Sequence, residues 1–129
     1  MKLGLAEPQV VKAAGLLGGG IAKSAQVCGA LTGAILALSS RYSRSSLEEQ
    51  EDPVMWQFGR RMVERFVTLT EPQGGILCRD IARVDWNDPE AVAQFRTSPE
   101  SRRRICIEVV GKTAEALGEL LEEAGASPG

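Results

Sequence analysis

Residues 26–38 read Gln-Val-Cys-Gly-Ala-Leu-Thr-Gly-Ala-Ile-Leu-Ala-Leu, and this run of small and apolar residues decides the fold class. It predicts a helix over about residues 24–42. Gly29 and Gly33 lie four residues apart, hence on one face of that helix, where a missing Cβ lets a neighbouring backbone or a bulky ligand come close. A glycine inside a helix costs about 1 kcal/mol relative to alanine. Close packing against another helix or against a ligand must therefore offset the free-energy cost of the two glycines, and both explanations stay open.

The same helix is too short to cross a membrane. The uncharged stretch between Lys23 and Arg41 has 17 residues and includes several serines, whereas a membrane span needs about 20 mostly apolar residues. The amino terminus carries Glu7 and Pro8 where a signal peptide would need its apolar run. We therefore expect a buried core helix in a cytoplasmic protein with reduced thiols.

The rest of the chain is punctuated by helix start signals. Proline suits the first turn of a helix, because its missing N–H would be unpaired there anyway. Four prolines follow residues that suit a helix start: Pro8, Pro53, Pro89 and Pro99. Apolar residues spaced by three and four predict long helices over about 53–69 and over 99 to about 123. Shorter helices are predicted over 8–17, 75–83 and 89–96.

These elements predict an all-α fold, a compact helical bundle of about four to six helices, some of them short. No stretch alternates between apolar and polar residues as a half-buried strand would. The length of 129 residues suits one helical domain over 1–129, with a frayed tail at 126–129.

The charged residues exclude several classes of function. The chain has 15 basic and 17 acidic residues and a net charge of −2, which argues against a general nucleic-acid binder. The run Arg102-Arg103-Arg104 is more typical of a solvated helix face than of an anion site. The absence of histidine excludes imidazole-based catalysis and His-containing metal sites. No acid–base constellation indicates an enzyme, so the sequence leaves enzymatic activity undecided.

A glycine run, Gly18-Gly19-Gly20, precedes the first long helix. Glycine-rich turns that lead into a helix can hold an anion on free backbone amides. This run matches neither the Walker loop nor the dinucleotide fingerprint, and no predicted strand precedes it. A flexible turn between two antiparallel helices is therefore the favoured interpretation.

Three cysteines, Cys28, Cys78 and Cys106, are the remaining candidates for chemistry. None belongs to a Cys-x-x-Cys pair, and an odd number cannot be fully paired within one chain. Each nevertheless has a positive neighbourhood: the first turn of a helix for Cys28, Arg79 for Cys78, and the preceding arginines for Cys106. Positive potential lowers the pKa of a thiol, so the sequence predicts thiolate chemistry, as redox exchange or soft-metal ligation. Cysteines that serve as small core hydrophobes are the alternative.

As a set, these features resemble a known family of redox-active proteins, named for a C…CGAxxG…C…C pattern. The resemblance covers about residues 9–120. It rests on residues that occur in the expected order, namely Gly18, Gly19, Gly20, Cys28, Gly29, Ala30, Gly33, Cys78, Arg79, Asp80 and Cys106.

The resemblance implies a small helical protein with a redox role. A similar domain forms the N-terminal part of the split-Soret cytochromes, where the cysteines are associated with an iron–sulfur cluster. It therefore implies that Cys28, Cys78 and Cys106 are cluster ligands or redox thiols, with Arg79 and Asp80 as secondary residues. The family has a further helix upstream of the glycine run, and that helix carries another cysteine. We expect this chain to lack this helix and its cysteine. A fourth ligand would then come from Asp80, another oxygen, a partner subunit or a small molecule.

Two functions follow as hypotheses. The first is a redox or electron-transfer protein that uses cysteine thiolates, with or without an iron–sulfur cluster, and that meets a redox partner protein. If it works through a disulfide, we expect Cys78 and Cys106 to be the pair. The second is a non-enzymatic helical interaction module with structural cysteines. A missing helix would leave apolar surface uncovered, so we also expect a homo-oligomer.

Overall fold

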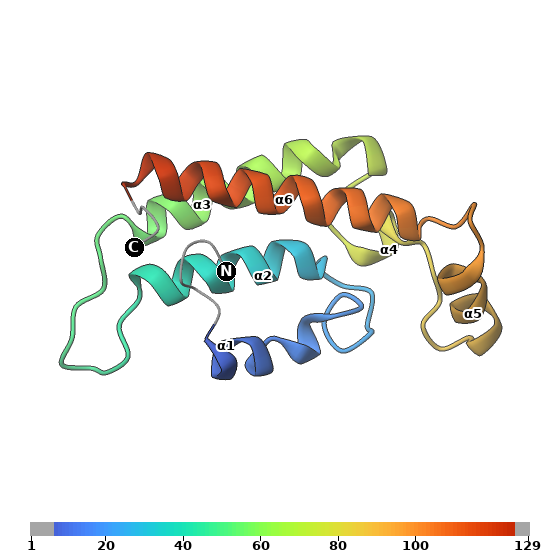
Figure 1. Cartoon of the computed structure of the whole chain (residues 1–129), viewed down its shortest axis with the longest axis horizontal. Coiled ribbons are helices and arrows are strands. Elements are labelled where there is room, and N and C mark those ends of the chain that lie inside the picture. Colours follow the sequence, from blue (N-terminus) through green and yellow to red (C-terminus); the bar gives the residue numbers. More distant parts are fainter. Residues whose placement is uncertain (1–6, 126–129) are drawn as a thin grey trace.

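Three long helices pack against one another and form the core. The computed structural model describes residues 7–125, and within them these helices are α2 (Gly29–Tyr42), α3 (Met55–Thr70) and α6 (Arg103–Glu123). Each of the three contacts the other two. Figure 1 shows α6 running alongside α3, with α2 below them. The polar segment 43–54 connects α2 to α3 at one end of the molecule.

The core residues recur at helical spacing because each long helix turns one apolar face inward. On α3 the buried side chains, Phe58, Met62, Phe66 and Thr70, are four residues apart. Two threonines are buried as well, and each hydroxyl donates a hydrogen bond to the carbonyl four residues earlier. The buried apolar side chains of the three helices are Leu31, Ala34, Leu38, Tyr42, Phe58, Met62, Phe66, Val109, Ala116, Leu120 and Leu121.

The shorter elements lie around this core. Helix α1 (Pro8–Ala13) and the 3-10 turn η1 (Gly15–Leu17) run along the side of α2, as Figure 1 shows. The 3-10 turn η2 (Glu71–Gln73) continues α3, and α4 (Cys78–Ile81) follows it. Helix α5 (Pro89–Thr97) lies at the end of the molecule where α6 begins. The Asp88 carboxylate caps α5 by accepting hydrogen bonds from the amides of Glu90 and Ala91.

The predicted all-α bundle of four to six helices is confirmed. Residues 7–125 contain six α-helices, two 3-10 turns and no β-strand beyond one isolated bridge. None of the helices in this part of the chain is long and apolar enough to span a lipid bilayer. The predicted frayed tail at 126–129 lies outside the described residues.

Four helices begin later than predicted, α2 and α6 by the most. Helix α3 begins at Met55 rather than 53 and α4 at Cys78 rather than 75, and the helix predicted over 8–17 ends at Ala13. Helix α6 begins at Arg103 rather than 99, because residues 98–102 form turns that end in the Arg102 N-cap position. Helix α2 begins at Gly29 rather than 24, because the preceding backbone is left-handed. The φ angles are 63° at Gly19 and 69° at Gly20, and they stay positive at Ile21, Ala22, Lys23 and Ala25.

We call residues 19–25 the 19–25 loop. A left-handed conformation costs an L-residue about 1–2 kcal/mol, so this loop requires compensation. Hydrogen bonds within the loop supply part of this compensation. The Lys23 amide donates to the Gly18 carbonyl, and the Gln26 amide donates to the Gly20 carbonyl. The Ser24 hydroxyl donates to the Gly20 carbonyl as well. The predicted flexible turn is therefore an internally hydrogen-bonded loop.

Candidate functional site

One short antiparallel bridge brings the first two cysteines together. Val27 and Leu77 form an isolated bridge between the end of the 19–25 loop region and the start of α4. The Cys28 amide donates to the Ile76 carbonyl at 3.0 Å, and the Cys78 amide donates to the Gln26 carbonyl at 2.6 Å. These bonds hold Cys28 and Cys78 side by side at the amino ends of α2 and α4, although the two residues are 50 positions apart in the sequence.

Gly20 is needed where the 19–25 loop meets α4. A Cβ at this position would lie 2.6 Å from the Cβ of Cys78 and 2.6 Å from the Gln26 amide nitrogen. Its φ of 69° is also unfavourable for any L side chain. The loop therefore approaches Cys78 as closely as it does because residue 20 is glycine.

Cys106 comes from the first turn of α6, which is tied to α4. The Arg102 Nε donates a hydrogen bond to the Ile81 carbonyl at 2.8 Å, and its Nη2 donates to the Gln73 side chain at 2.5 Å. The Cys106 amide in turn donates a hydrogen bond to the Arg102 carbonyl. The amino end of α6 is therefore held against the segment that carries Cys78.

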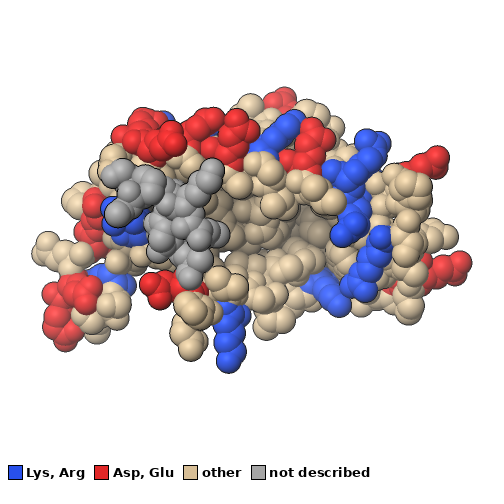
Figure 2. Space-filling view, viewed as in Figure 1, with Lys and Arg blue, Asp and Glu red and all other residues tan. Residues whose placement is uncertain are grey.

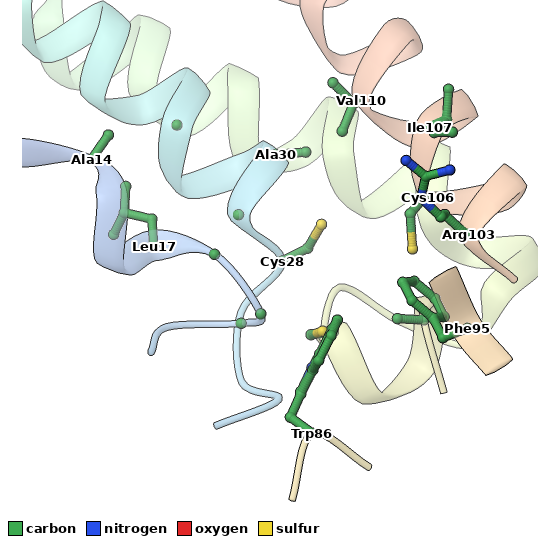
Figure 3. A pocket seen from close by; sticks show the side chains of 17 residues that line it. Ala14, Leu17, Cys28, Ala30, Trp86, Phe95, Arg103, Cys106, Ile107 and Val110 are labelled. Atoms are coloured by element: carbon green, nitrogen blue, oxygen red, sulfur yellow. The ribbon is translucent and has the colours of Figure 1, made fainter. Parts of the chain in front are cut away.

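The three cysteines line one open pocket of about 540 Å³, which we call the thiol pocket. Its remaining lining is largely apolar and comes from η1, α2, α5 and α6 and from turns beside α1, η1 and α4. Figure 3 shows Cys28 and Cys106 pointing into the space between α2 and α6, with Trp86 and Phe95 beside them. All three cysteines are free thiols, with Cys78 buried and the other two partly exposed. Three distant segments thus present sulfur to a common cavity.

Burial raises the pKa of two thiols, contrary to the prediction of low-pKa thiolates. At Cys28 desolvation raises the pKa above 9.0 and the nearby Cys78 adds to it, although the Ala30 and Leu31 amides oppose the shift. At Cys106 desolvation raises the pKa to about 11, with Cys28 and Cys78 adding and Arg102 opposing. Positive neighbours are present as predicted, but loss of water outweighs them. Cys28 and Cys106 thus each lie within electrostatic range of another cysteine of the pocket.

Six of the motif residues also line this pocket, namely Gly18, Gly19, Gly20, Gly29, Ala30 and Gly33. Gly29 and Gly33 play different parts. A Cβ on Gly29 would lie 2.9 Å from the Leu17 carbonyl oxygen, so this glycine allows η1 to pack on α2. A Cβ on Gly33 would meet no atom within 4 Å. Gly33 therefore leaves space in the pocket rather than serving helix packing.

The secondary candidates Arg79 and Asp80 do not line the thiol pocket. The Arg79 Nε donates to the Ala25 carbonyl at 3.2 Å and so fastens the 19–25 loop. The Asp80 carboxylate lies close to Gly75, where a Cβ would come within 2.6 Å of its Oδ2. Arg79 thus links α4 to the 19–25 loop, and Asp80 lies against Gly75.

The sequence did not predict that Trp86 and Phe95 line this pocket, and Arg103, which was interpreted as part of a solvated helix face, lines it as well. The two rings meet edge to face, with centroids 5.4 Å apart and planes at 73°. No spacing signal links residue 86 to residue 95 or to the cysteines, because a turn and the start of α5 intervene. The Trp86 Nε1 atom is buried and has no hydrogen-bond partner within the described chain.

The side chains of residues 7–125 do not form a preorganised site for a single metal ion. Within residues 7–125, no three Cys, Asp or Glu side chains are grouped closely enough to hold one ion. Thiolates are suitable ligands for soft metals and iron–sulfur clusters, so the chemistry of the donors fits such a group. Their number does not fit a cluster held by four cysteines, because the whole chain has three.

The fold and the site define a class, a small helical protein with several free thiols around one apolar pocket. The chain belongs to the family described as "Putative redox-active protein (C_GCAxxG_C_C)", which it matches over residues 1–120. The family label reads Gly-Cys-Ala where this chain reads Cys28-Gly29-Ala30, and it shows four cysteines where the chain has three. Neither a curated protein nor a solved structure matches the chain.

Proposed function

We propose that this chain is a redox protein whose working groups are the thiols of the thiol pocket. The observation that carries the proposal is that Cys28, Cys78 and Cys106 line the same cavity although they come from separate parts of the sequence. Membership of a family described as redox-active supports it. Two of the thiols form a disulfide while an external disulfide is reduced, so two electrons and two protons pass from protein to oxidant.

Cys28 is the first nucleophile in this proposal. It is partly exposed, whereas Cys78 is only 8% exposed. It occupies the N-cap position of α2, and the Ala30 and Leu31 amides favour its thiolate. Cys106 is less readily ionised, because burial raises its pKa to about 11. The thiol that resolves the first bond is Cys78 or Cys106, and the pair Cys78–Cys106 stays a prediction.

A redox titration tests the proposal. The reduced protein is equilibrated without oxygen in mixtures of reduced and oxidised dithiothreitol, quenched with acid, labelled with a maleimide and weighed by mass spectrometry. We expect one two-electron transition in which three labels become one. Among the variants C28S, C78S and C106S, two lose the transition and one keeps it. Three labels at every ratio would favour the interaction module with structural cysteines.

An iron–sulfur cluster is the second candidate. The observation that favours it is a set of three thiols around one cavity, since soft thiolates suit such clusters. A cluster with four protein ligands would take its fourth ligand from outside this pocket lining, for instance from a partner subunit or a small molecule. Anaerobic purification followed by a visible spectrum and assays of iron and sulfide tests it. A colourless protein without iron would reject the cluster, and thiol–disulfide exchange would remain as the proposed function.

A further inference from the structure

The residues that line the thiol pocket and one adjoining recess include positive charges and no negative charge. Its lining includes Arg103 and no aspartate or glutamate. A neighbouring recess of about 350 Å³ shares Gly18, Gly19 and Trp86 with it and adds Lys23 and Arg96, again without an acid. We call this the basic recess. Figure 2 shows a hollow on this face with Lys and Arg side chains beside it. The chain as a whole is acidic, at −2, so this local balance is unusual.

These three cations are not committed to carboxylates elsewhere. The ion pairs among residues 7–125 involve Arg61, Arg65 and Lys112, none of which lines either cavity. Apolar walls strengthen the effect of a charge at their rim, because field lines are focused through a low-dielectric cleft. A ligand with a negative group is therefore favoured over a neutral or positive one.

Trp86 supplies an independent sign of a ligand. Its side chain lines both the thiol pocket and the basic recess, and its buried Nε1–H has no acceptor in the described chain. A buried donor without an acceptor costs about 1–3 kcal/mol. A ligand that offers an oxygen acceptor at the junction of the two cavities would remove that cost.

We propose that the thiol pocket takes an anionic organic disulfide, with its S–S bond against the thiols and its negative groups toward Arg103, Arg96 and Lys23. This inference rests on the proposed thiol function and names its substrate class. A cavity of 540 Å³ falls within the range of small-molecule sites, about 300–1,000 Å³.

The reaction balances as two exchanges. The Cys28 thiolate attacks one sulfur of the disulfide, the S–S bond breaks, and the first organic thiolate leaves and takes up a proton. A second pocket cysteine, as thiolate, then attacks the Cys28 sulfur and releases the second organic thiol. The protein ends with one disulfide, and the substrate ends as two thiols that carry the two protons.

Three small disulfides of similar shape test the charge preference. They are 3,3′-dithiodipropionate with two carboxylates, bis(2-hydroxyethyl) disulfide without charge, and cystamine with two ammonium groups. The rate of thiol loss is measured for each at low salt and divided by its rate with N-acetylcysteinamide, a neutral free thiol. We expect the corrected rate to be about tenfold higher for the dianion than for cystamine. We expect the ratio to shrink in about 1 M salt.

Matched variants locate the effect. R103Q and R96Q should each lower the ratio several-fold, whereas R65Q, which removes a cation from the Arg65–Glu119 ion pair on α3 and α6, should leave it unchanged. W86F should weaken the preference without loss of stability, since it removes an unpaired donor. Equal corrected rates for all three disulfides would overturn this inference and keep the redox proposal. Absence of exchange with every probe would overturn the redox proposal itself.

Discussion

At the scale of single residues, Cys106 shows how burial governs the chemistry of the pocket. Arg102 lies close enough to favour its thiolate, yet desolvation and two neighbouring thiols raise the pKa to about 11. Sequence analysis identified all three cysteines of the pocket and the positive residues beside them. It could not predict the sign of the pKa shift, because desolvation depends on which segments cover a residue in the fold.

This shift makes stability depend on pH. Above about pH 9 the unfolded state releases the Cys106 proton, while the folded state retains it until about pH 11. Ionisation thus stabilises the unfolded state first, and the free energy of unfolding falls between these two values. Cys106 is partly exposed, so we expect a loss of about 1–2 kcal/mol rather than the full shift.

Urea unfolding under reducing conditions between pH 8 and pH 11 measures this contribution, with C106S as the control. Serine does not titrate in this range, so the stability of wild type relative to C106S should decrease as pH rises. A difference between the two proteins that stays constant with pH would show that Cys106 is not buried as described.

At the scale of elements, the sequence predicted most helix positions and missed the 19–25 loop. Proline predicted the first residue of α1, Pro8, and of α5, Pro89. It failed at Pro53, because α3 begins at Met55, and α1 ends at Ala13 rather than 17. The start of α2 was wrong by five residues. Ala22, Lys23 and Ala25 have no local preference for left-handed backbone. They are supported by hydrogen bonds within the loop and by the pairing of Val27 with Leu77, 50 residues away.

Two glycine-to-alanine variants separate close packing from open space. G20A places a Cβ 2.6 Å from Cys78 at a positive φ, so we expect a loss of about 2 kcal/mol or more. G33A adds its Cβ within helix α2 where no atom lies within 4 Å, and we expect no loss or a gain of up to about 1 kcal/mol. Chemical denaturation of both measures the difference. Similar losses for both variants would contradict the described role of Gly20.

At the scale of the whole molecule, the three-helix core explains why cysteines that are distant in the sequence line one pocket. Helices α2, α3 and α6 hold the amino ends of α2 and α6 near α4, and the bridge at Val27 and Leu77 completes the arrangement. Helical spacing made the core faces predictable. The aromatic wall from Trp86 and Phe95 was not, because its position depends on how α5 folds back toward the pocket.

The expected homo-oligomer stays a prediction. Apolar side chains on α6, Ile107 and Val110, are 60% and 54% exposed, and burial of apolar area on association is favourable by about 25 cal/mol per Å². Static light scattering of the reduced protein at micromolar concentration measures the mass. We expect a dimer or larger assembly, and a mass of one 13.8 kDa chain at every concentration would contradict it.

The central claim is that sulfurs from separate segments share one cavity and lie close enough to react with each other. Phenylarsine oxide tests it most directly, because its arsenic bonds two neighbouring thiols at once and releases one water. We predict that one equivalent removes two of the three reactive thiols, and that a dithiol reverses this while a monothiol does not. If all three thiols remain reactive after the arsenical is added, the sulfurs do not share a site.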